Sequence, residues 1–96
     1  MKMLMLVYSG PSPQRVASLL DRHHVAGYME FHHVHGTGAT GRREGTRAWP
    51  GESALFLTIA EPEQATALLD ALRAERTSLP AGERLHVAVL PTETFF

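Results

Sequence analysis

The sequence contains no cysteine, so neither a disulfide framework nor thiolate chemistry is available to it. It also has little net charge: the formal value is -1, so the chain as a whole does not attract nucleic acid or an anionic membrane. The N-terminal apolar run extends only from Met3 to Tyr8, which is too short for a signal-peptide core or a membrane span. We therefore expect a cytoplasmic protein that neither binds nucleic acid nor inserts into a membrane.

Signatures of covalent catalysis are also missing from the sequence. There is no G-x-S-x-G elbow and no paired-carboxylate spacing, so no nucleophile with an adjacent base can be identified. Glu30 and Glu52 flank a glycine-rich segment, but neither has an identifiable partner. Catalysis has no positive support, and we expect a protein that is not an enzyme.

What is present is typical of a single folded domain. The 96 residues are 44% hydrophobic and 20% charged, which suits one small globular unit over residues 1–96. Hydrophobic periodicity predicts two helices, over 13–24 and from Pro62 to about Arg76, with Ser12 as the N-cap of the first. Four strands are expected at Met3–Tyr8, Tyr28–His35, Ser53–Ala60 and Leu85–Leu90. Pro91 lacks a donor, so residues 91–96 are expected to form a C-terminal tail.

The order βαββαβ predicts an α+β, ferredoxin-like sandwich, with two helices on one face of a four-stranded antiparallel sheet. Within the second strand, Met29 and Phe31 share one face but Val34 has the opposite parity. A β-bulge near His32 and His33 would return Val34 to the core face, because one extra residue resets the alternation.

The first, third and fourth predicted strands are apolar on both faces, as Met3 to Leu6 and Leu55 to Leu57 show. Two helices can cover only one face of the sheet, so the other face would be a large exposed apolar patch in a monomer. The simplest cover for that face is another copy of the same chain.

The segment FHHVHGTGATGRREGTRAWPGES, residues 31–53, is the most unusual stretch of the chain. Its G-x-G-x-x-G resembles a dinucleotide fingerprint, but no helix can begin in the glycines and proline that follow. A passive loop over 36–52 would be unusually long for so small a domain. An anion site is favoured instead, since glycines allow backbone N–H groups to converge on an anion and arginines supply bidentate donors. The candidate residues are Gly36, Thr37, Gly38, Gly41, Arg42, Arg43 and Arg47.

The histidines before the glycines allow a second interpretation. His33 and His35 are two residues apart on a predicted strand and hence on one face, a spacing that Cu or Zn sites use. His86 or a neighbouring subunit could supply the third ligand. The alternative is an ordinary polar strand face, and the sequence leaves both open.

The element order and two motifs resemble the PII signalling superfamily, which includes CutA-type proteins. The family's V-K-G-F-G-R at the entry of its long loop is similar to V-H-G-T-G at Val34–Gly38, with Arg42 and Arg43 following. The family's T-G-x-x-G-D-G-K is spaced like residues 77–84, which would put Thr77 and Arg84 at positions that contact nucleotide phosphates. Ser78, Ala81, Gly82 and Glu83 depart from that motif, which argues against the family's usual mode of ATP binding.

The resemblance implies a homotrimer with its sheet face buried, in which residues 36–52 form the equivalent of the family's T-loop. It further implies a small anionic effector, an adenine nucleotide or bicarbonate, bound at clefts between subunits. The regulatory target would be a membrane transporter, an efflux pump or an enzyme. The loop contains no tyrosine, so the uridylylation of some members has no acceptor here. Two alternatives remain: a CutA-like or efflux-linked metal-binding protein, and a small dimeric ferredoxin-like enzyme.

Overall fold

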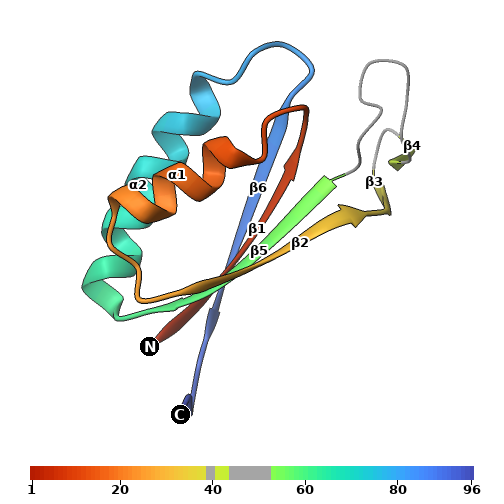
Figure 1. Ribbon diagram of the computed structural model, residues 1–96. Coiled ribbons are helices and arrows are strands. Elements are labelled where there is room, and N and C mark those ends of the chain that lie inside the picture. The colour runs from red at the N-terminus through yellow and green to blue at the C-terminus, as the bar shows by residue number, and fades with distance from the viewer. Residues whose placement is uncertain (39–40, 44–52) are drawn as a thin grey trace.

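The structure is a computed structural model that describes residues 1–38, 41–43 and 53–96. Within these residues the helices are α1 (Gln14–Arg22) and α2 (Pro62–Thr77), and the strands are β1 (Lys2–Ser9), β2 (Tyr28–Val34), β3 (Gly36–Gly38), β4 (Gly41–Arg43), β5 (Ser53–Ala60) and β6 (Arg84–Pro91). The four long strands form one antiparallel sheet in the order β2-β5-β1-β6, and both helices lie on the same face of it (Figure 1). The predicted ferredoxin-like βαββαβ sandwich is confirmed.

Alternation along the strands decides which side chains enter the core, because successive strand residues point to opposite faces. Leu4, Leu6 and Tyr8 of β1 are each 0% exposed beneath the helices. The helices contribute apolar stripes that repeat at helical spacing. The remaining buried apolar residues are Val16, Leu19 and Leu20 of α1, Ala65, Leu68 and Leu72 of α2, Ala54, Phe56 and Ala60 of β5, and Leu85 of β6.

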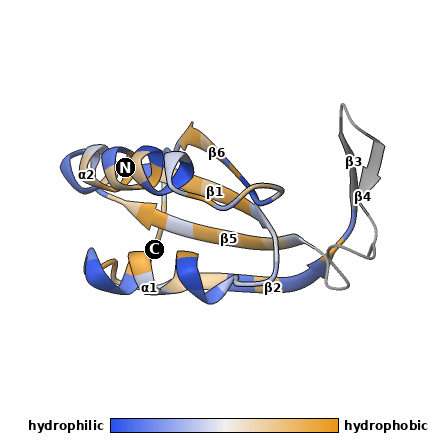
Figure 2. Cartoon of the chain, turned by 90° about the horizontal axis from the view of Figure 1, so that it is seen from above, coloured by the Kyte–Doolittle hydropathy of each residue, from blue (hydrophilic) through white to orange (hydrophobic). Residues whose placement is uncertain are grey.

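The other face of the sheet is apolar as well, as predicted. Met5 of β1 stands opposite Leu57 of β5 and Ala88 of β6, all on the side away from the helices. Figure 2 shows that β1 and β5, at the centre of the sheet, are largely hydrophobic. On the outer strands of this face Met29 is 61% exposed, Phe31 40% and Leu90 44%. A single chain therefore leaves this apolar sheet face, called the open face below, in contact with solvent.

The predicted bulge in β2 is present, and its consequence differs from the prediction. The pairing register shifts between Phe31 and Val34, and His33 has a φ of 61°, so the alternation is reset there. Val34 pairs with Ser53 and Phe31 with Leu55, which places both on the open face rather than on the core face. The side of β2 that faces the helices carries Tyr28, whose ring packs 6.2 Å from that of Phe56. The strand ends at Val34, one residue before the predicted end.

Several element boundaries differ from the prediction by one or two residues. Helix α1 has Pro13 rather than Ser12 as its N-cap, with no side-chain cap, and ends at Arg22. The Ser12 N–H instead donates to the Tyr8 hydroxyl at 3.0 Å. Strand β6 includes Pro91, which pairs with Lys2. Proline is tolerated there because β6 is an edge strand.

The segment predicted as a loop over 36–52 begins with regular structure. Strands β3 and β4 pair antiparallel, with Gly36 opposite Arg43 and Gly38 opposite Gly41. They form a small two-stranded sheet separate from the main one, beyond the end of β2 (Figure 1). Neither described helix is long and apolar enough to cross a membrane.

Candidate functional site

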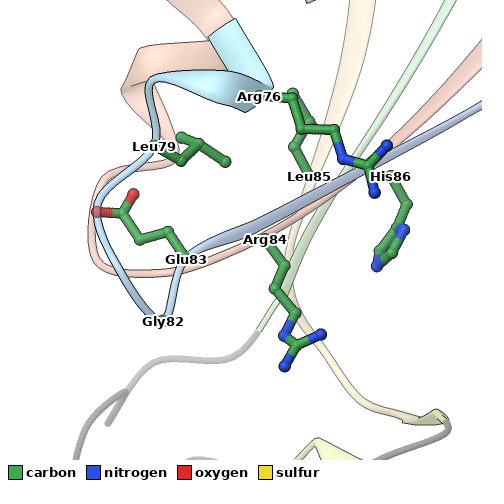
Figure 3. A pocket seen from close by; sticks show the side chains of 7 residues that line it. All are labelled: Arg76, Leu79, Gly82, Glu83, Arg84, Leu85 and His86. Atoms are coloured by element: carbon green, nitrogen blue, oxygen red, sulfur yellow. The ribbon is translucent and has the colours of Figure 1, made fainter. Parts of the chain in front are cut away.

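A pocket of about 280 Å³ lies where α2 ends and β6 begins. Helix α2 stops at Thr77, and the chain turns back through a tight turn in which the Glu83 N–H donates to the Pro80 carbonyl at 3.1 Å. Gly82 occupies the third position of this turn with a φ of 89°, a conformation that glycine adopts without steric penalty. The pocket is lined by Arg76, Leu79, Gly82, Glu83, Arg84, Leu85 and His86 (Figure 3).

Basic side chains dominate this pocket. Arg84 and His86 are two residues apart on β6 and therefore lie on the same face of the strand. Arg76, from the last turn of α2, extends its guanidinium to the same side as the His86 ring (Figure 3). Glu83 is the one acidic residue among the seven, and its carboxylate points to the opposite side. The pocket can thus present guanidinium donors to an anion, and the one carboxylate among its seven lining residues does not face them.

The Glu83 carboxylate is held by contacts with β1 and α1. Its side chain is only 5% exposed, and its Oε1 accepts a hydrogen bond of 2.5 Å from the Tyr8 hydroxyl. The Arg15 Nε lies 4.0 Å from the same oxygen, and the Arg15 guanidinium also donates to Glu75 at 3.2 Å. Burial and the Glu83 carboxylate together raise the pKa of Tyr8 to about 12. The phenol therefore keeps its proton throughout the neutral range and can donate to Glu83.

Gly10 packs against this cluster. A Cβ added at Gly10 would overlap the Tyr8 hydroxyl and lie 2.9 Å from the Glu83 Cγ, because the backbone passes directly over both side chains. We expect Gly10→Ala to lower the free energy of unfolding by about 1–3 kcal/mol, as overpacking does elsewhere. Denaturant unfolding measures this change, and Gly27→Ala is the control, since an added Cβ there meets nothing within 4 Å. Equal losses in the two variants would contradict the predicted clash.

The structure does not bring the predicted anion-site residues together in one place. Gly36, Thr37, Gly38, Gly41, Arg42 and Arg43 belong to the β3–β4 hairpin, whereas Arg47 lies outside the described residues. Arg84 lines the pocket. Thr77 is not among the residues that line it, and its hydroxyl donates to the Ala74 carbonyl at 2.8 Å. Their roles in ligand binding stay predictions.

The sequence analysis placed Arg76 only at the end of a helix, considered His86 only as a metal ligand and did not identify the Tyr8–Glu83 contact. Arg84 and His86 are two residues apart, and this spacing along a strand could have predicted that both side chains lie on the same face. Arg76 joins them because the turn after α2 brings the start of β6 back beside the end of the helix (Figure 3).

The histidines do not assemble into a metal site within the described residues. His32 pairs with Glu30 at 2.6 Å between Nε2 and Oε2. His33 is the bulge residue with positive φ, and His35 follows the end of β2, so the regular strand spacing predicted for these two is interrupted. In ranges 1–38, 41–43 and 53–96, no group of three potential ligands could hold a metal ion. The predicted Cu or Zn site therefore has no support there.

Similar folds occur among solved structures of PII-like proteins. CPII of Thiomonas intermedia K12, a nitrogen regulatory PII-like protein bound to ADP, AMP and bicarbonate, has a TM-score of 0.67 at 21% identity, over 93% of this chain and 86% of its own. Its apo form has a TM-score of 0.63 at 17% identity, over 93% and 87%. A chain from Thermus thermophilus, named as a PII-like signalling protein, has a TM-score of 0.62 at 21% identity, over 93% and 85%.

No family model matches the sequence, and no curated protein matches it. At these identities the structural likeness establishes the fold, which is the PII-like, ferredoxin-like one that the sequence motifs resembled.

Proposed function

Because the chain has the fold of PII-like proteins, we propose that it is a cytoplasmic regulatory protein, not an enzyme, that binds an adenine nucleotide at the pocket between α2 and β6. The observation that carries this proposal is the gathering of Arg76, Arg84 and His86 around one pocket from which the Glu83 carboxylate is turned away. Guanidinium groups bind phosphate oxygens through paired, charge-assisted hydrogen bonds. The ADP and AMP bound by CPII support the choice of ligand class.

The size of the pocket bears on how the ligand is held. About 280 Å³ is at the lower limit of pockets that enclose a small-molecule ligand. The phosphates fit this space, whereas the rest of a nucleotide needs further walls. We propose that a second copy of the chain supplies them, so that the site lies in a cleft between subunits. Bicarbonate is the second candidate effector, because it is small enough for the pocket of a single chain and is bound by CPII.

Titration calorimetry with AMP, ADP, ATP, cyclic AMP and bicarbonate tests the proposal. We expect heat with an adenine nucleotide, and a loss of affinity of roughly 10- to 100-fold in Arg84→Ala, the range expected for a hydrogen bond to a charged group. Arg73→Ala is the matched control, since Arg73 is 74% exposed on α2 and pairs only at the surface with Asp70. Absence of heat with every ligand, or equal affinity in both variants, would refute the site.

The oligomer and the regulated partner are parts of the same proposal. The apolar open face is best buried in a homotrimer, in which each chain covers part of its neighbour's sheet. We propose that the β3–β4 hairpin and the segment after it contact the target, which would be a transporter, an efflux pump or an enzyme. Ligand-dependent protection of the amides of Gly36–Gly38 and Gly41–Arg43 from hydrogen exchange would support this role.

A further inference from the structure

The Glu83 side chain is more deeply buried than is usual for an acidic residue. With 5% of its side chain exposed, the carboxylate has given up most of its hydration, and burial of a carboxylate is unfavourable unless partners replace the lost water. The Tyr8 hydroxyl donates a hydrogen bond of 2.5 Å, and the Arg15 Nε, 4.0 Å away, adds a nearby positive charge without a hydrogen bond. Tyr8 is itself fixed, because its ring is 0% exposed and its hydroxyl accepts the Ser12 N–H. The carboxylate is therefore attached to a rigid point of the core.

This attachment determines the orientation of the next residues. Glu83 and Leu85 face the core, so Arg84 and His86 must face the other way, as alternation along a strand requires. The pairing of Arg84 with Ser9 and of His86 with Val7 begins directly after Glu83. A slip by one residue would exchange the two faces and remove both basic side chains from the pocket.

The same contact also keeps a negative charge out of the pocket. Glu83 adjoins Arg84 in the sequence, and a freely rotating carboxylate at this position could pair with Arg84 or Arg76 in place of a ligand. In the structure it points away from all three basic side chains (Figure 3). The hydrogen bond from Tyr8 of β1 holds it there, and the charge of Arg15 in the first turn of α1 favours the same position.

We propose that Glu83 is a positioning residue for the anion pocket: anchored by Tyr8 and Arg15, it fixes the turn before β6 so that Arg84 and His86 face the ligand. This inference rests on the proposed function for the identity of the ligand. The anchor itself is a property of the free protein, and it can be tested without any ligand.

Binding of ADP to Glu83→Ala distinguishes positioning from simple electrostatics. If Glu83 acted only as a nearby negative charge, its removal would strengthen binding of an anion. Positioning predicts the opposite, a loss of affinity of roughly tenfold, about the effect of one hydrogen bond lost from a buried network. Glu83→Gln retains an oxygen that accepts the Tyr8 hydrogen bond, so it should restore most of the affinity. Tyr8→Phe should behave like Glu83→Ala while keeping the buried ring. Unchanged or tighter binding of ADP by Glu83→Ala would overturn the inference.

Hydrogen exchange of the free protein gives a second measurement. The amides of residues 79–84 should exchange faster in Glu83→Ala and Tyr8→Phe than in the wild type and Glu83→Gln, because the turn has lost its anchor. Equal protection in all four proteins would overturn the inference, whatever the result with ADP. If the wild type does not bind ADP but the exchange rates differ as expected, the anchor holds and the proposed function fails.

Discussion

Replacing Met29 by glutamate is expected to convert a homotrimer of three 10.6 kDa chains into monomers. Met29 is 61% exposed in a single chain, so a charge at this position does not disturb folding of the monomer. On the open face it stands opposite Leu57, on the outer strand β2 of the apolar surface that we propose to be buried between copies. A carboxylate buried there without a partner costs several kcal/mol, and a symmetric trimer would incur that penalty three times.

Light scattering coupled to size-exclusion chromatography measures the mass of the assembly directly. Ala67→Glu introduces the same charge on the exposed surface of α2, away from the sheet, and should leave the trimer intact. A wild-type mass of one or two chains would contradict the trimer, and a dimer would favour the small ferredoxin-like enzyme. A Met29→Glu protein that remains trimeric would show that the open face is not the interface.

Replacing Phe56 by alanine is expected to lower the free energy of unfolding by about 3–5 kcal/mol, the usual range for a buried phenylalanine. Phe56 is 0% exposed at the middle of β5, between Leu6 of β1 and Glu30 of β2, and its ring packs against that of Tyr28. Phe56 belongs to the same buried cluster as residues of both helices, so the surrounding side chains can fill only part of the cavity left by the ring. A loss of this size is a large part of the 5–15 kcal/mol that stabilises a typical domain.

Denaturant unfolding at one fixed protein concentration measures this loss, since the stability of an oligomer depends on concentration. Val89→Ala is the control, because Val89 is 39% exposed at the far end of the helix-facing side of β6. It should cost less than about 1 kcal/mol. A loss below about 1.5 kcal/mol for Phe56→Ala would mean that the helices do not pack on β5 as described.

The elements that could be predicted from the sequence are those whose pattern is local. The run Ser53–Ala60 is bounded by turn residues and was predicted to the residue, and the parity of Val34 was enough to predict a bulge. The sequence pattern did not show on which face of the sheet Val34 would lie after the bulge. Only the placement of the helices shows that Met29 and Phe31 lie on the open face.

The candidate site was harder to predict, although the residues that line it all lie between Arg76 and His86, because the contact that orients Glu83 comes from a distant segment. Arg84 was found through its motif, but the motif offered no sign that Glu83 would contact Tyr8 at the other end of the chain. The β3–β4 hairpin was missed because its six residues include three glycines, which have low strand propensity. The two strands pair through their backbones, and the pattern of apolar and polar side chains does not indicate this pairing.

The central position of β1 has a consequence for how the chain folds during synthesis. β1 precedes both of its neighbours in the sheet by long stretches of chain: Leu4 pairs with Thr58 of β5 and with Val89 of β6. Its backbone therefore stays unpaired until the ribosome has made β5 for one edge and β6 for the other. Such long-range closure slows folding, since chain entropy is lost before any contact repays it. The nascent strand β1 is accordingly the segment that a chaperone would have to protect.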